Sequence, residues 1–396
     1  MIAALLGATL AFSPTRPLTF SPAHALTFSP AHALEFSPTH PLARSPAHAL
    51  ADTAHDTVFV ASNRRRAARG FTRDVSDSLW YGIYVTRLVT DSGGPRALAV
   101  MHVQRLDSVA LDEAAWSARL AAAASDTAAR HAALVYVHGY SSAPGTAVAQ
   151  AVQVKARGAH GGPLIVFLWP THSRYVAPPT PARAYRDDAA AAARSGLAFA
   201  HVLGIVDSLA PGSVLVAHSM GTRVALAAAI GDTALRQRLE ARPLRAFGIF
   251  SPDIGATPFR ADFAPLLPLI ARRVALYGAS NDYLLGMAAL VNRERRASGI
   301  TARGAALPGI ELVDVTRGAR AEPALLTLLG PRHAVRWASA ALADFFGIVV
   351  AGTPGDCRVA AASAVARGEG RWRLKANATL PEWLDASCAP SAPQGR

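Results

Sequence analysis

The stretch Val216-Ala217-His218-Ser219-Met220-Gly221 places one serine at the junction of two different hydrophobic patterns. An apolar run typical of a buried strand, residues 213–216, leads into it, and a run typical of a helix, residues 222–230, leads out. This pattern is typical of a nucleophile elbow, a sharp strand-to-helix turn that raises a hydroxyl above a sheet. The small residues that such a turn needs, two positions before and after the serine, are Ala217 and Gly221. Serine is also a common helix N-cap, so the motif needs support from the rest of the chain.

Strand-like and helix-like segments alternate on both sides of this turn. Helical patterns at residues 145–157 and 183–209 separate short apolar runs, and the second pattern ends at Pro211-Gly212. Strands that are buried on both faces read as continuous apolar runs. The alternation predicts an α/β fold with a mostly parallel, doubly wound sheet flanked by helices, and a site at the carboxyl ends of the strands. The apolar runs are residues 132–137, 164–169, 213–216, 245–250, 273–277 and 311–315.

The composition divides the chain into three parts. Residues 1–50 hold an octapeptide repeat, in which Phe12-Ser13-Pro14 recurs as Phe20-Ser21-Pro22 and in later units. A proline in every repeat interrupts helices and strand ladders, so we expect a disordered or targeting leader. We expect the α/β domain over residues 56–347 and a C-terminal extension over residues 351–396. Before the alternation, strands are expected at residues 57–61, 79–89 and 97–104, and a helix at residues 111–129.

Side chains and backbone groups suited to catalysis follow the first of these buried strands. His138-Gly139-Tyr140 comes directly after residues 132–137, and backbone N–H groups at such a position can stabilise a developing oxyanion. We expect the N–H groups of Tyr140 and Met220 to form the oxyanion hole. The aromatic residues expected to line the substrate pocket are His138, Trp169 and His218.

Two carboxylates and one histidine follow later strands. Asp282 lies after residues 273–277, and Asp253 lies in Ser251-Pro252-Asp253, where a turn role after proline is an equally ordinary interpretation. His333 follows the last predicted strand. The order Ser219, Asp282, His333 is the order of the catalytic triad in α/β-hydrolases, and Asp253 is the alternative acid.

These three residue types suit acyl transfer. A serine hydroxyl is a weak nucleophile until a base removes its proton, and histidine titrates near neutral pH, so it can act as base and then as acid. A buried carboxylate fixes the tautomer of that histidine. We therefore expect a serine hydrolase that cleaves carboxylic or lipid esters through an acyl-enzyme on Ser219. Two alternatives stay open: an amide or peptide hydrolase with the same triad, and a catalytically silent fold that serves as an envelope-associated binding module.

The composition argues against several other classes. The formal net charge is +13, but the basic residues are nearly all scattered arginines, and the densest cluster is Arg64-Arg65-Arg66. We interpret that cluster as a solvated surface, so we expect no nucleic-acid partner, although such a surface suits contact with an anionic membrane. Cys357 and Cys388 lie outside any Cys-x-x-Cys or Cys/His cluster. We expect no metal and no other cofactor.

The first residues are compatible with two locations. Residues 1–12 are apolar but lack the basic segment of a secretory signal. No run is long and apolar enough for a transmembrane helix, since the Ala-rich stretch near residue 200 is interrupted by Arg194, His201 and Asp207. Both the cytoplasm and export to the periplasm or cell envelope remain open.

The motifs taken together resemble a known family. They are similar to the α/β-hydrolases of the bacterial lipase- or esterase-like group that is catalogued as a domain of unknown function, over about residues 56–347. The resemblance implies an α/β-hydrolase fold and a Ser-Asp-His triad, and it supplies no substrate. The matching pieces are Val58-Phe59-Val60-Ala61-Ser62-Asn63-Arg64, Tyr81-Gly82, Val137-His138-Gly139-Tyr140, Trp169-Pro170, Tyr185 with Asp188, Ala217-His218-Ser219-Met220-Gly221, Pro252-Asp253-Ile254, Asn281-Asp282 and His333.

Overall fold

The computed structural model describes most of the chain between His55 and Lys375. The octapeptide leader, His333 and Cys388 lie outside the described residues. The residues that it describes are 55–68, 70–91, 100–126, 132–172, 181–317, 339–360 and 364–375.

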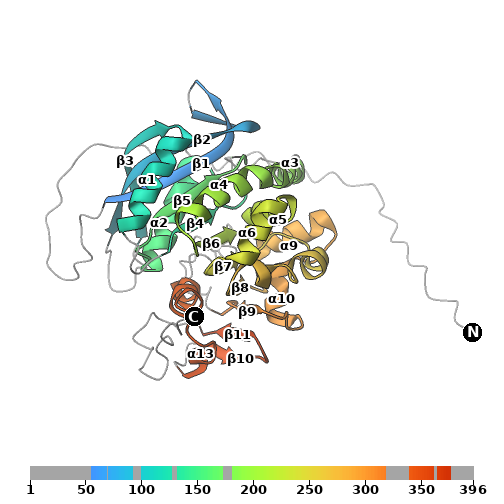
Figure 1. Ribbon diagram of the computed structural model, residues 1–396. Coiled ribbons are helices and arrows are strands. Elements are labelled where there is room, and N and C mark those ends of the chain that lie inside the picture. The colour runs from blue at the N-terminus through green and yellow to red at the C-terminus, as the bar shows by residue number, and fades with distance from the viewer. Residues whose placement is uncertain are drawn as a thin grey trace, which may run out of the picture. The chain divides into compact units, whose positions relative to one another are not determined.

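An 11-stranded sheet forms the centre of this described part, in the order β10-β11-β9-β8-β7-β6-β4-β5-β1-β2-β3 (Figure 1). Neighbouring strands are parallel from β11 across to β1, whereas β10, β2 and β3 pair antiparallel. The predicted α/β fold with a mostly parallel sheet is therefore confirmed. The strands are β1 (His55–Ala67), β2 (Gly70–Asp91), β3 (Val100–Leu111), β4 (Leu134–Val137), β5 (Leu164–Leu168), β6 (Val214–His218), β7 (Ala246–Phe250), β8 (Val274–Gly278), β9 (Ile310–Asp314), β10 (Ala364–Ala366) and β11 (Arg371–Leu374).

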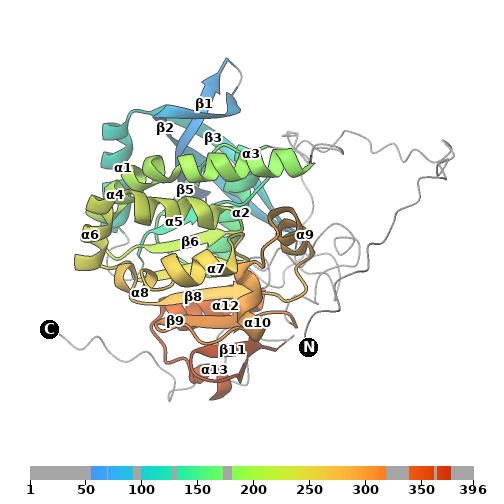
Figure 2. The same ribbon diagram turned by 90° about the vertical axis from the view of Figure 1, so that its right-hand side faces the viewer.

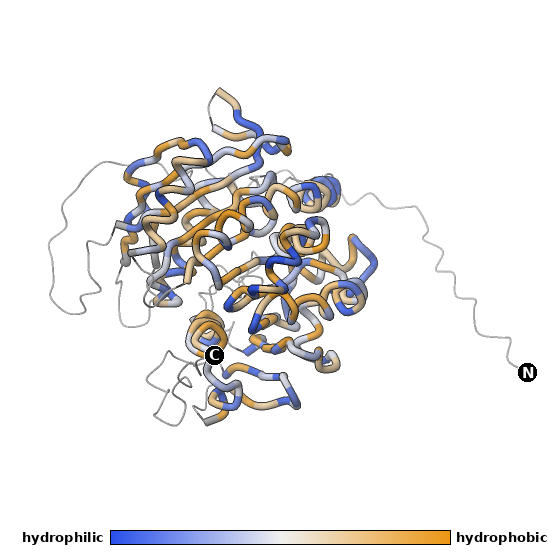
Figure 3. Tube along the Cα trace, viewed as in Figure 1, coloured by the Kyte–Doolittle hydropathy of each residue, from blue (hydrophilic) through white to orange (hydrophobic). Residues whose placement is uncertain are grey.

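Helices cover both faces of the sheet, because successive side chains of its strands point to opposite sides. Val135 and Phe167 pack with residues of α1, α4 and α5 on one face, whereas Tyr136 and Val166 pack with α2, α12 and η6 on the other. Hydrophobic residues accordingly dominate the central strands (Figure 3). The helices are α1 (Glu113–Asp126), α2 (Pro144–Arg157), α3 (Pro181–Arg194), α4 (Gly196–Leu209), α5 (Gly221–Gly231), α6 (Thr233–Ala241), α7 (Ala256–Pro258), η1 (Phe259–Phe263), α8 (Leu267–Ile270), α9 (Tyr283–Asn292), η2 (Ala297–Gly299), α10 (Ile300–Arg303), α12 (Ser339–Asp344), η6 (Phe345–Val350) and α13 (Cys357–Ala360).

The single helix expected over residues 183–209 is two helices, α3 and α4. The hydroxyl of Ser195 donates to the carbonyl oxygen of Ala191 at 2.8 Å, a bond that bends helices, and it accepts a hydrogen bond from Asn63 at 2.9 Å. Among the described helices, none is long and apolar enough by itself to cross a membrane; α3 and α4 together pass by length and composition, with a bend of 45° between them.

Part of the expected C-terminal extension belongs to the central sheet. β11 pairs parallel with β9, and β10 pairs with β11 at the end of the sheet (Figures 1 and 2). Arg358 is fully buried, ion-paired to Asp344 at 2.6 Å and to Glu311, and lies over the ring of Trp372. Cys357 is disulfide-bonded. Within residues 357–360 and 364–374, Cys357, Arg358, Ala364, Trp372 and Leu374 are thus buried with the strands that precede them.

Candidate active site

Ser219 occupies the turn between β6 and α5 in a strained backbone conformation. Its φ of 52° lies in the left-handed region, which non-glycine residues rarely adopt. Hydrogen bonds hold it there: its N–H donates to Phe250 at 2.9 Å, and its carbonyl oxygen accepts from Thr222 at 3.1 Å and from Asp253 at 3.2 Å. Such strain persists only where the surroundings enforce it, and it gathers at functional sites. The strand, turn and helix expected from the sequence are present.

The loop after β4 lies directly against this turn, and glycines permit the approach. A Cβ on Gly139 would lie 3.0 Å from Cβ of Ser219 and 2.7 Å from Nδ1 of His218. A Cβ on Gly221 would lie 2.4 Å from the carbonyl oxygen of His138. The backbone of Gly139, the residue before Tyr140, therefore lies beside Ser219.

His138 and Trp169 pack together and support the loop after β4. Their rings stack with centroids 5.2 Å apart and an interplanar angle of 8°, and Nε1 of Trp169 donates to the carbonyl oxygen of His138 at 2.7 Å. Both side chains are fully buried, and His218 is also buried. Contact of these three residues with a substrate stays a prediction.

Asp253 lies at the centre of a buried charged network. Its carboxylate accepts hydrogen bonds from the hydroxyl of Tyr185 at 2.8 and 2.7 Å, and lies 3.4 Å from Nε of Arg296 and 3.7 Å from Nη2 of Arg223. Nε of Arg223 also donates to the Asp253 carbonyl oxygen at 2.7 Å. Burial, followed by the nearby Asp253 carboxylate, raises the pKa of Tyr185 far above its usual value, so its hydroxyl remains a donor. The carboxylate of Asp253 is thus already engaged by a phenol and two guanidinium groups.

Asp282 lies after β8 and begins α9. Its side chain is mostly buried, and Oδ1 accepts the N–H of Leu285 at 3.0 Å, which caps the helix. Only residues 279–281 separate it from the end of β8, so this carboxylate lies near the carboxyl ends of the strands. His333, the expected base, lies outside the described residues.

A chain of hydrogen bonds joins the Asp282 loop to the C-terminal strand. The N–H of Ser280 donates to Oγ1 of Thr316 at 2.9 Å, and that hydroxyl donates to Asp314 at 2.5 Å. Nε of Arg373 on β11 donates to the other oxygen of Asp314 at 2.8 Å. Arg373 therefore helps to hold the Asp282 loop, through Asp314 and Thr316.

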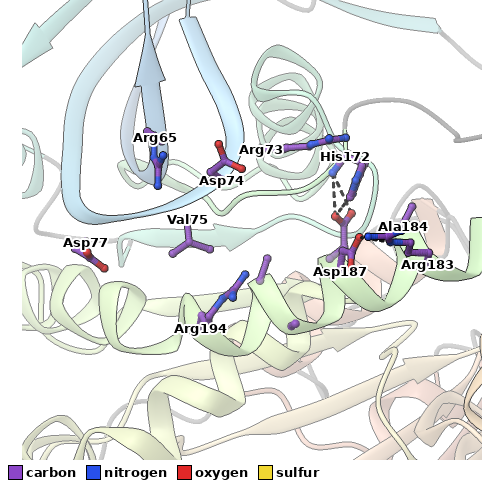
Figure 4. A pocket seen from close by; sticks show the side chains of 13 residues that line it. Arg65, Arg73, Asp74, Val75, Asp77, His172, Arg183, Ala184, Asp187 and Arg194 are labelled. Carbon is purple, nitrogen blue, oxygen red and sulfur yellow. Dashed lines mark hydrogen bonds and ion pairs between the residues drawn. The ribbon is translucent and has the colours of Figure 1, made fainter. Parts of the chain in front are cut away.

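A pocket of about 890 Å³ lies between the β1–β2 hairpin and α3 (Figure 4). It contains none of the predicted site residues, and its arginines are matched by an equal number of aspartates. His172 contacts Asp188 there through Nδ1, and Asp188 accepts the backbone N–H of His172 at 3.0 Å. Burial raises the pKa of Asp188, and the hydrogen bonds from His172 oppose that shift. The charged lining residues are Arg65, Arg73, Arg183, Arg194, Asp74, Asp77, Asp187 and Asp188.

Arg64 belongs to the arginine cluster that we expected to be solvated, but its side chain is buried. Arg64 is 3% exposed, and its Nη2 donates to the carbonyl oxygen of Ser142 at 2.8 Å. Burial lowers its pKa to about 10, with Asp188 opposing that shift. Arg65 and Arg66 are exposed. The interpretation of the cluster was therefore wrong for Arg64, which supports the loop after β4.

Comparison with known proteins gives one family. The model of a family described as "Alpha/beta hydrolase of unknown function (DUF900)" matches residues 113–324. The match contains Ser219, Asp253 and Asp282, and it ends before His333. None of the curated proteins matches the chain. Within the described residues, no three histidine, cysteine or acidic side chains are grouped so that they could hold a metal ion.

Proposed function

The chain belongs to this family of α/β-hydrolases, DUF900, and we propose that it is a serine hydrolase that cleaves carboxylic or lipid esters through an acyl-enzyme on Ser219. The observation that carries the proposal is the strained backbone of Ser219, with φ of 52°, against which the Gly139 loop packs. A serine held in that conformation at a strand-to-helix turn presents its hydroxyl above the sheet.

Stabilisation of the oxyanion is assigned to two backbone N–H groups, those of Met220 and Tyr140. Met220 is the N-cap residue of α5, where the positive end of the helix dipole favours negative charge. Tyr140 follows Gly139, whose backbone lies against Ser219. Hydrogen-bond donors that are fixed in place before the reaction stabilise a developing negative charge far better than mobile water does. Two such N–H groups would therefore stabilise the oxyanion of a tetrahedral intermediate.

Asp282 is the better candidate for the acid, and Asp253 the poorer one. An orienting carboxylate must accept a hydrogen bond from the histidine, and the Asp253 carboxylate is already surrounded by Tyr185, Arg223 and Arg296. Asp282 lies after β8, at the position where the chain order Ser-Asp-His of α/β-hydrolases expects the acid.

The proposed reaction then follows from the residue types. His333 takes the hydroxyl proton of Ser219 as its Oγ attacks the ester carbonyl, and Asp282 stabilises the charged imidazole. The N–H groups of Met220 and Tyr140 hold the oxyanion. His333 returns the proton to the departing alcohol, and water then hydrolyses the acyl-enzyme by the same steps.

A fluorophosphonate probe tests the nucleophile. The full-length protein should be labelled at Ser219, and Ser219→Ala should lose both labelling and hydrolysis of p-nitrophenyl esters. Ser208→Ala, which removes an exposed hydroxyl on α4, is the matched control and should retain both. Full labelling of Ser219→Ala would refute the proposal. An anilide cleaved faster than the ester of the same acid would instead assign amide hydrolysis.

A further inference from the structure

A second pocket, of about 620 Å³, lies beside the proposed triad acid. Asp282 and Ser280 line it from the loop after β8, and Ala256 lines it from the segment after β7. It therefore lies at the carboxyl ends of these strands, the edge at which open α/β sheets bind ligands.

The charges that line this pocket are mostly positive. It contains four arginines, and Asp282 is its only acidic lining residue, in contrast to the balanced charges of the pocket beside α3. Arg296 is ion-paired to Asp253. The other three arginines form no ion pair with any carboxylate in the described part of the chain. These three are Arg260, Arg295 and Arg303.

The pocket lining also includes apolar side chains and one buried hydroxyl. Leu285 and Ala289 contribute hydrocarbon surface from α9, and Ile300 contributes it from α10. Ser298 is 1% exposed, and its Oγ has no hydrogen-bond partner among the described residues. That oxygen is buried beside Gly278 of β8, so the arginines are the polar groups that the pocket offers to a ligand.

We propose that this pocket binds the anionic group, a carboxylate or a phosphate, of the ester that Ser219 attacks. Arginine recognises both groups through paired, charge-assisted hydrogen bonds, and the three unpaired guanidinium groups supply them. The inference rests on the proposed function and narrows its substrate class to esters that carry a negative charge.

The sheet sets the separation between the anionic group and the ester. β8 is the second strand from β6 in the sheet. Neighbouring strands are about 4.8 Å apart, so the pocket lies roughly 10 Å from the elbow along the sheet. The favoured substrate therefore carries its charge at the far end of a medium-length chain, and not next to the scissile bond.

A pair of p-nitrophenyl esters tests this in the full-length enzyme. One is the monoester of suberic acid, with a free carboxylate at the far end of its acyl chain, and the other is the octanoate, which has the same chain length and no charge. Arg260→Gln/Arg303→Gln should lower kcat/KM for the suberate ester roughly tenfold to hundredfold, and should leave that for the octanoate unchanged. Arg272→Gln, which removes an exposed arginine before β8 and outside the pocket, is the control. Equal effects of the double variant on both esters would overturn the inference.

A binding measurement separates this inference from the proposed catalysis. Suberate and inorganic phosphate are titrated into full-length Ser219→Ala by calorimetry, with and without the two arginine substitutions. Binding that weakens at least tenfold in the arginine variant supports the anion site even if no ester is hydrolysed. Tighter binding of phosphate than of suberate supports the site and assigns it to phosphate-bearing esters. Absence of binding by both anions overturns it, whatever the activity at Ser219.

Discussion

The backbone N–H of Asp253 donates to the carbonyl oxygen of Ser219 at 3.2 Å, so the segment after β7 directly holds the strained turn after β6. The carboxylate of the same residue lies among Tyr185, Arg223 and Arg296. Asp253 thus joins a buried charged network to the backbone of the proposed nucleophile. We expect its effect on Ser219 to be one of position, because its carboxylate already contacts Tyr185, Arg223 and Arg296.

Asp282→Asn should abolish most ester hydrolysis without unfolding the protein. Asparagine caps a helix about as well as aspartate, so α9 should persist, but an amide cannot fix the tautomer of His333 or stabilise its charged form. We expect kcat to fall by about ten-thousand-fold, as measured by steady-state hydrolysis. An Asp282→Asn enzyme with nearly full kcat would remove Asp282 from the triad.

Asp253→Asn should instead lower the stability of the protein and leave Ser219 reactive. The substitution leaves Arg296, which is 6% exposed, beside a neutral side chain, and an uncompensated buried charge costs about 3 kcal/mol or more. Urea unfolding should show that loss of stability, while the fraction that remains folded still reacts with the fluorophosphonate. If Asp253→Asn were as stable as the wild type and inactive, Asp253 would be the triad acid.

Gly139→Ala should slow acylation of Ser219 with little change in stability. The added methyl group would meet Cβ of Ser219 at 3.0 Å and Nδ1 of His218 at 2.7 Å, so the loop must move away from the elbow. A displacement of about 1 Å in an active site can cost a hundredfold in rate. The pseudo-first-order labelling rate is the measurement. Gly145→Ala is the control, because nothing lies within 4 Å of a Cβ at that position.

The sequence was sufficient for the parallel strands and the elbow because both depend on local patterns. β6 is buried along its whole length, so it appears in the sequence as an uninterrupted apolar run, and the small residues flanking Ser219 report the tight turn directly. The break at Ser195 was missed, because a serine within a helical pattern carries no sign that its hydroxyl will bind both Ala191 and Asn63.

Long-range charge pairing could not be predicted from the sequence. Asp253 and Asp282 both follow a strand, and only their partners in space distinguish them. Arg64 is buried whereas Arg65 and Arg66 are exposed, and three identical residues in a row give no sign of that difference. The missed strand β11 did carry a signal: Arg371-Trp372-Arg373-Leu374 alternates polar and apolar residues, and its burial alternates in the same way.

Alkaline pH should destabilise the protein, and Tyr185→Phe should remove part of that dependence. Burial raises the pKa of Tyr185 in the folded state above its value of about 10 in the unfolded chain. The stability that this contributes is complete below pH 10 and is lost as pH rises toward the folded-state pKa. Urea unfolding at pH 9 and pH 11 measures how much the free energy of unfolding falls between these pH values. Tyr81 and Tyr277, whose pKa values are also raised, add to this fall. An equal fall in unfolding free energy for Tyr185→Phe and wild type would contradict a contribution from Tyr185.

Arg373→Met should slow acylation although Arg373 lies outside the matched region of the family. Asp314 is 2% exposed and would lose its cation, which weakens the hydrogen bonds that run through Thr316 to Ser280 in the Asp282 loop. We expect a loss of about 1–3 kcal/mol in unfolding free energy and a lower kcat with little change in KM. Arg371→Met is the control for strand stability, because Arg371 lies two residues away on the same strand and forms no ion pair with any carboxylate in the described part of the chain. If both variants lowered kcat equally, the effect would come from β11 as a whole; a loss of kcat confined to Arg373→Met shows that the hydrogen-bonded chain positions the acid loop.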